Sequence, residues 1–85
     1  MSRFTKLHNK IKNNPQEIRF EEIDSLLKNA GFQKRKGKGS HMIYSHPDLN
    51  DIRDYITIPY KKPHIKKIYI KRALEILERL NQDNG

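Results

Sequence analysis

The chain has 85 residues and no cysteine, so a single small domain is expected, and disulfides and thiolate metal sites are excluded. Lys and Arg number 18 against 10 Asp and Glu, a net charge of +8, which favours a polyanionic partner such as nucleic acid, an acidic protein or an anionic membrane surface. No stretch approaches the roughly 18 apolar residues of a membrane span, and nothing near Met1 resembles a signal peptide. We therefore expect a cytoplasmic domain.

Two amphipathic helices are predicted in the first third of the chain. In residues 3–14, Phe4, Leu7 and Ile11 fall on one helical face, and Pro15 follows the end of the pattern. Three apolar residues supply little energy for insertion into a membrane, so we expect this helix to dock on the core.

The second predicted helix, over residues 20–30, has a stronger apolar stripe. Its apolar residues are Phe20, Ile23, Leu26, Leu27 and Ala30. Acidic side chains crowd its start, where the helix dipole favours negative charge. Gly31 stands at the position that helices often fill with glycine just after their last turn.

Three short strands are predicted next, at residues 32–36, 40–46 and 54–58. Gly37-Lys38-Gly39 forms the turn between the first two, because glycine adopts positive φ at little cost. A polar loop over residues 46–51 separates the second strand from the third. In the third strand, Ile56 and Ile58 point to the same side.

A last helix is predicted from Ile68 to Leu80. Its apolar face consists of Ile70, Ala73, Leu74, Leu77 and Leu80. Glu75 and Arg79 are spaced to pair on the outer face, and residues 81–85 form a polar tail.

The order of these elements predicts the fold class. Three consecutive strands joined by short loops form an antiparallel meander, and the helices must cover one of its faces. We predict one α+β domain over residues 1–85, a two-layer sandwich in which 1–19 is a helical extension and 20–80 form the core. The other sheet face is left for solvent or a partner.

The sequence has two basic clusters, one around the predicted hairpin turn and one on the way into the last helix. The first consists of Lys34, Arg35, Lys36 and Lys38. Strand alternation sends Lys34 and Lys36 to one side and Arg35 to the other. The second cluster consists of Lys61, Lys62, Lys66, Lys67, Lys71 and Arg72. Two clusters on one small domain can span successive phosphates, which favours nucleic acid over merely solubilising charge.

His41 is the candidate for chemistry. An imidazole can take a proton from the 2′-hydroxyl of RNA, which then attacks the adjacent phosphate, and nearby Lys and Arg stabilise the added charge without a metal. A strand histidine is, however, more often a surface or packed residue than a catalyst, so both interpretations stay open. A catalytic His41 must reach solvent, which would turn Met42 and Tyr44 inward.

Other site chemistries fit the sequence poorly. His41 and His46 are five residues apart, so a strand puts them on opposite faces and they make a poor metal pair. We expect no metal and no small-molecule cofactor. Ser40 diverges from its neighbour His41 on a strand, which argues against a Ser–His nucleophile and for contact with backbone or phosphate. Tyr60, in a basic loop, is a candidate for contact with RNA, whereas Tyr44 is assigned to the core.

Residues 20–80 resemble the HicA family of bacterial toxins, small mRNA interferases with a double-stranded-RNA-binding-domain-like fold. The matching pieces are Leu26-Leu27, Gly31-Phe32, Arg35, Gly39-Ser40-His41, Tyr44, His46-Pro47 and Ile58-Pro59, followed by a Lys-rich connection and a helix. Residues 1–19 resemble an N-terminal extension found on some members.

The resemblance implies that His41 is the catalytic residue of a ribonuclease that cleaves mRNA and stops translation. It also implies a HicB-type antitoxin that covers the active site and often supplies DNA binding for autoregulation. Many members carry a second histidine shortly after the proline that ends the third strand. Tyr60 and Lys61 stand there in this chain, and His64 need not be equivalent.

The main hypothesis is a ribosome-independent mRNA interferase, an endoribonuclease in which His41 is the general acid or base. Its predicted RNA-binding residues are Lys34, Arg35, Lys36, Lys38, Gly39, Ser40, Tyr60, Lys61 and Lys62. Glycine at 37 and 39 would let the backbone approach a phosphate. The alternatives are a non-catalytic RNA-binding module of the same fold and a basic interaction protein for an acidic partner.

Overall fold

The computed structural model contains the six predicted elements in the predicted order. They are α1 (Arg3–Asn13), α2 (Phe20–Asn29), β1 (Gln33–Lys36), β2 (His41–Ser45), β3 (Ile56–Pro59) and α3 (Lys67–Asn84). The structure describes residues 3–49 and 54–84, and the side chains at 3, 4 and 81–84 lie outside that description. The predicted core role of Phe4 and the end of the 46–51 loop therefore lie outside the described residues.

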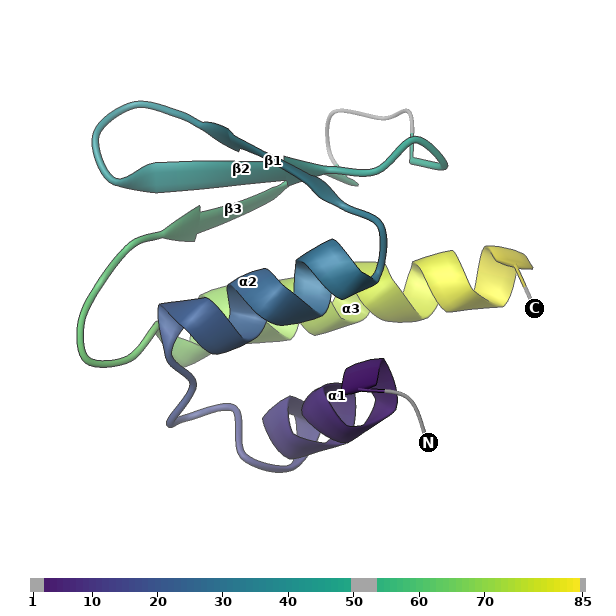
Figure 1. Ribbon diagram of the computed structural model, residues 1–85, viewed down its shortest axis with the longest axis horizontal. Helices are drawn as coiled ribbons and strands as arrows, with labels where there is room; N and C mark the ends of the chain where they lie inside the picture. Colours follow the sequence, from purple (N-terminus) through teal and green to yellow (C-terminus); the bar gives the residue numbers. More distant parts are fainter. Residues whose placement is uncertain (1–2, 50–53, 85) are drawn as a thin grey trace.

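The elements form an α+β fold in which a three-stranded sheet lies on two helices (Figure 1). The strand order is β1-β2-β3, and both pairs are antiparallel. Helices α2 and α3 cover one face of the sheet, and α1 lies beneath them, on the side away from the strands. The predicted fold class is confirmed, and it is consistent with a double-stranded-RNA-binding-domain-like fold.

The strand register decides which side of the sheet each residue occupies. Tyr44 pairs with Lys34 on β1 and with Ile56 on β3, so these three side chains point toward the helices. His41, one of the residues of opposite parity, points to the open face. Exposure agrees, since Tyr44 is fully buried and His41 is exposed. Tyr44 therefore points inward, as the hypothesis of a catalytic His41 requires.

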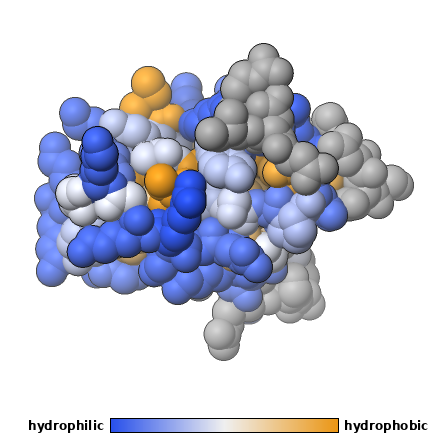
Figure 2. Space-filling model, turned by 90° about the horizontal axis from the view of Figure 1, so that it is seen from above, coloured by the Kyte–Doolittle hydropathy of each residue, from blue (hydrophilic) through white to orange (hydrophobic). Residues whose placement is uncertain are grey.

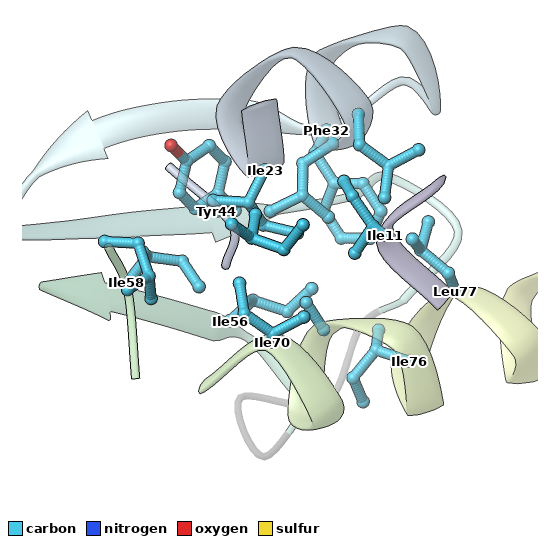
Figure 3. Close-up of a cluster of buried hydrophobic side chains, with 14 of the residues drawn as sticks. Ile11, Ile23, Phe32, Tyr44, Ile56, Ile58, Ile70, Ile76 and Leu77 are labelled. Carbon is cyan, nitrogen blue, oxygen red and sulfur yellow. The ribbon is translucent and has the colours of Figure 1, made fainter. Parts of the chain in front are cut away.

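The core is built largely from the predicted apolar stripes. Figure 3 shows Ile56 and Ile58 of β3 above Ile70 of α3, with Tyr44 of β2 and Ile23 of α2 beside them. All five side chains have no exposed surface. Ile11 of α1 is equally buried, which confirms that this helix docks on the core.

Phe32 and three further core residues lie in the connections between the elements. Ile18, Leu49 and Ile65 are buried, and the Ile65 N–H donates to the Ile18 carbonyl at 2.8 Å, which joins two connections. A single apolar residue between elements has no periodic pattern to reveal it. For the same reason the sequence predicts only a polar loop over residues 46–51, although Leu49 in that loop is buried.

The element ends differ most from the prediction at β3 and at α3. β3 begins at Ile56 instead of at residue 54, because Asp54 is buried and its carboxylate accepts a hydrogen bond from Arg79 on α3 at 2.7 Å. Arg79 thus pairs with Asp54 and not, as expected, with Glu75. Helix α3 continues to Asn84, past the predicted end at Leu80, since each added helical residue costs little once a helix has formed.

No helix in the described ranges is long and apolar enough to cross a membrane.

The part-buried carboxylate of Asp24 joins α2 to the sheet. The Tyr44 hydroxyl donates to Asp24 at 2.6 Å, and the ammonium groups of Lys28 and Lys34 lie 3.1 and 3.3 Å from the same carboxylate. Burial alone would raise the pKa of Asp24, but the hydrogen bonds from Tyr44, Lys28 and Lys34 outweigh it, and the pKa lies below its usual value. Burial and then Asp24 raise the pKa of Tyr44.

We predict that Tyr44→Phe weakens the fold mainly where Asp24 is ionised. A carboxylate with a depressed pKa stabilises the fold above its unfolded pKa of about 3.9, and that stability is lost as pH falls through the folded pKa. The free energy of unfolding at pH 7 should fall by about 1.5–3 kcal/mol, as for a hydrogen bond to a charged group.

The measurement is urea denaturation of both proteins from pH 7 to pH 2. The difference between them should shrink on acidification, and a difference that stays constant with pH would contradict the assigned role of Asp24.

Candidate active site

His41 begins β2, directly after the hairpin turn. Its Nδ1 lies 3.0 Å from the carbonyl oxygen of Lys38. A carbonyl oxygen can only accept, so Nδ1 carries the hydrogen and donates it. In the neutral ring Nε2 is then the basic nitrogen, on a side chain that is exposed to solvent. The arrangement suits a group that must take a proton from a ligand.

The backbone holds this residue from both sides. Toward β1, the Gly37 N–H donates to the His41 carbonyl at 2.8 Å. Toward β3, His41 is paired with Pro59, and the next pair is closed by the Tyr60 N–H, which donates to the Ser40 carbonyl at 2.8 Å. His41 therefore sits on the central strand, whose position is fixed by both neighbours.

The basic clusters gather at the end of the molecule where His41 lies. In Figure 1 the hairpin, the end of β3, the β3–α3 connection and the start of α3 are all on the left. Lys38 is in the hairpin, Lys61 and Lys62 follow β3, and Lys67 begins α3; all four are exposed. Figure 2 looks onto the open face of the sheet and shows that this end is mostly hydrophilic. Residues distant in sequence thus form one basic end.

The first basic cluster is divided by the sheet. Arg35 lies on the open face with His41, whereas Lys34 and Lys36 point to the helix side at the edge of β1. The Lys34 ammonium lies 3.3 Å from Asp24 and 5.8 Å from the centroid of the Phe20 ring. A phosphate-binding role for Lys34 stays a prediction, and its charge already has a carboxylate partner.

The two turn glycines differ. Gly39 has a φ of +59°, and a Cβ placed there would meet nothing within 4 Å. A Cβ on Gly37 would lie 3.0 Å from a side-chain carbon of Ile43. Glycine at 39 is thus favoured by backbone conformation, whereas a side chain at 37 would crowd Ile43.

Tyr60 is 39% exposed, and its ring lies 4.9 Å from the Phe20 ring with a tilt of 59°. One aromatic ring is therefore held against another at the basic end while part of its surface stays accessible, as stacking with a base requires. The core assignment of Tyr44 is confirmed by its complete burial.

His46 is fully engaged by the fold. The Asp48 N–H donates to its Nδ1 at 3.0 Å, so Nε2 carries the hydrogen and donates to the Ala30 carbonyl at 3.1 Å. The centroids of its ring and of the Phe32 ring lie 5.0 Å apart in an edge-on arrangement. A Cβ on Gly31 (φ +97°) would lie 3.0 Å from His46 Nε2. The Gly31-Phe32 and His46 pieces are thus one packing unit at the end of α2.

His64 also lies in the β3–α3 connection at the basic end. It lines a pocket of about 890 Å³ together with Lys10, Arg19 and Lys62, and His41 is not among the residues around that pocket. Within residues 3–49 and 54–84, no three His, Asp or Glu side chains come together as a metal site would require.

The sequence did not predict the role of Asp24 or of His46, because both roles depend on contacts between residues that are distant in the chain.

A comparison with known protein families places this chain. A family model described as "HicA toxin of bacterial toxin-antitoxin" matches residues 20–78, well over half of the chain. The protein is therefore a toxin of a bacterial toxin–antitoxin system, and the family implies an antitoxin partner. The chain belongs to the HicA toxin family. No curated protein and no solved structure matches it.

His41, at the start of β2, and His46, just after its end, should differ in their effect on stability. His46→Ala leaves the Ala30 carbonyl and the Asp48 N–H without partners, which should lower the free energy of unfolding by about 1–3 kcal/mol. His41→Ala removes one exposed hydrogen bond and should change it by only about 0.5 kcal/mol. Urea denaturation at pH 7 of the two variants and the wild type tests this, and equal losses would refute the division.

Proposed function

We propose that this toxin is an endoribonuclease that cleaves mRNA without the ribosome, with His41 as its general base and acid. The observation that carries the proposal is the exposed His41 imidazole, whose Nδ1 is held by the Lys38 carbonyl at 3.0 Å at the basic end of the molecule. It offers a basic Nε2 where the charge attracts a phosphodiester backbone.

The proposed step is attack within the RNA itself. Nε2 of His41 takes the proton from a 2′-hydroxyl, and the 2′-oxygen forms a bond to the adjacent phosphorus. The bond from phosphorus to the 5′-oxygen then breaks, and the imidazolium returns the proton to that leaving oxygen. The products are a 2′,3′-cyclic phosphate and a 5′-hydroxyl, and protons and bonds balance with no further reactant.

Cations around His41 support the step. Arg35 shares its face of the sheet, and Lys38 is in the same turn, so both are suited to oppose the negative charge that grows on the phosphate oxygens. Lys61 and Lys62 would hold the flanking backbone, and Ser40 and Lys36 lie within the same hairpin. Tyr60 would stack on a base, which is worth about 1–3 kcal/mol in single-strand binding.

The physiological role follows from the family. Cleavage of mRNA would stop translation as a stress response in the cytoplasm, and a HicB-type antitoxin would restrain it by covering the basic end. A polyanionic substrate and an antitoxin compete for the same charges in this scheme.

We predict that His41→Ala stays folded and loses RNA cleavage by at least about 100-fold, the lower range for a general acid–base group, together with growth arrest. His64→Ala is the comparison, because His64 is also exposed but lines a pocket that does not include His41. It should cleave like the wild type.

The assay is cleavage of a defined RNA by purified protein, with the product ends identified. A folded His41→Ala protein that still arrests growth would sink the assignment. Salt-sensitive RNA binding by a wild type that never cleaves would point instead to a non-catalytic binding module.

Lys38→Ala and Lys34→Ala should separate RNA binding from folding. Loss of one phosphate contact to a single strand reduces the slope of log affinity against log salt by about 0.7. We expect this for Lys38→Ala. Lys34→Ala should reduce the slope less, because its ammonium also pairs with Asp24.

Binding would be measured with the non-cleaving His41→Ala background at several salt concentrations. The opposite ranking of the two lysines would show that RNA draws Lys34 away from Asp24.

A further inference from the structure

One carbonyl in the hairpin turn accepts two hydrogen bonds from the same residue. The Lys38 carbonyl receives the main-chain N–H of His41 at 3.1 Å and its Nδ1–H at 3.0 Å. The first bond closes the turn and the second orients the ring. The turn and the imidazole are therefore tied to a single oxygen atom.

Gly39 gives this turn its shape. It follows Lys38 with a φ of +59°, while no residue other than glycine has positive φ in the described part of the chain, so Ser40 does not. The turn closed by the His41 N–H and the Lys38 carbonyl has Gly39 at its first central position, and the positive φ there is one that glycine adopts at little cost and most other residues rarely adopt. An L-residue there would rotate the peptide that carries the Lys38 carbonyl.

We propose that Gly39 is a positioning residue for His41. Its left-handed backbone aims the Lys38 carbonyl at the imidazole and so selects the tautomer with hydrogen on Nδ1, which leaves Nε2 as the base. The catalytic consequence rests on the proposed function, but the tautomer is a property of the folded chain and can be tested without RNA.

The open space around Gly39 separates this role from a steric one. Because a Cβ at position 39 would meet nothing within 4 Å of the protein, Ala fails there through its backbone preference and not through a clash. Asn tolerates positive φ far better than Ala does. If Gly39 served only to leave room for an approaching RNA backbone, Ala and Asn would both be harmful, and the tautomer would not change.

His46 supplies an internal reference. Its Nδ1 accepts from Asp48 and its Nε2 donates to Ala30, which is the opposite tautomer to that of His41. It also lies at the far end of β2 from Gly39, so a change confined to the turn should leave it untouched.

The first experiment is a long-range ¹H–¹⁵N correlation spectrum of the whole chain at about pH 8.5, where ordinary imidazoles are neutral. The wild type should show the Nδ1–H pattern for His41 and the Nε2–H pattern for His46. In Gly39→Ala the His41 signals should move toward the Nε2–H pattern while those of His46 stay, which also shows that the fold is intact. Gly39→Asn should retain the wild-type pattern for His41.

The second experiment is steady-state RNA cleavage by the same proteins. Gly39→Ala should lower kcat by about 100-fold, as for a displaced catalytic group, with KM within a few-fold of the wild type. Gly39→Asn should recover most of kcat.

Three results overturn the proposal: a wild-type His41 with hydrogen on Nε2, an unchanged tautomer in Gly39→Ala, or equal loss of kcat in Ala and Asn variants whose tautomer is unchanged. A wild type that does not cleave RNA refutes the nuclease, and the spectra alone then decide the role of Gly39.

Discussion

The hydrogen bond between the buried Tyr44 hydroxyl and Asp24 is the constraint on which the rest of the structure depends. At 2.6 Å it fastens the middle of the central strand to α2. Successive strand residues alternate between faces, so a Tyr44 that points at the helices leaves His41 no choice but the open face. The burial of Tyr44, three residues along β2, thus determines that His41 is exposed. The opposite orientation of β2 would be costly, because Asp24 would lose the hydrogen bond from the Tyr44 hydroxyl.

The hairpin and the end of α2 use the same side chain chemistry for opposite purposes. His46 commits both ring nitrogens to backbone groups and closes the junction of α2 with the sheet. His41 commits one nitrogen to a backbone carbonyl and keeps the other for a ligand. The pieces that resemble the HicA family therefore divide into a packing set, which includes Gly31, Phe32 and His46, and a site set around Gly39, Ser40 and His41. The resemblance alone did not distinguish them.

Local pattern was enough to predict the helices, the strands and the inward direction of Ile56 and Ile58, because those features follow from periodicity. Periodicity does not predict which face of the sheet His41 occupies, because both sides of β2 mix apolar and polar residues. The contact that determines the face is the hydrogen bond from Tyr44 to Asp24, which lies twenty residues earlier in the chain. The burial of Ile18, Leu49 and Ile65 was not predictable for the same reason. Neither were the ion pairs of Lys34 with Asp24 and of Arg79 with Asp54. The family resemblance was the main reason to select His41, because its sequence context alone does not distinguish it from an ordinary surface histidine. In the structure, the hydrogen bond to the Lys38 carbonyl fixes the orientation of its ring.

Helix α1 lies outside the family-matched segment, yet Ile11 is fully buried and Ile18 is joined to Ile65 across the connection that leads to α3. Lys12 also pairs with Glu78 on α3 at 3.9 Å. The segment that matches the family model is thus shorter than the unit that folds cooperatively. A fragment trimmed to the matched residues would lack part of its own interior, so in this toxin the extension has become an integral part of the folding unit rather than an appendage to it.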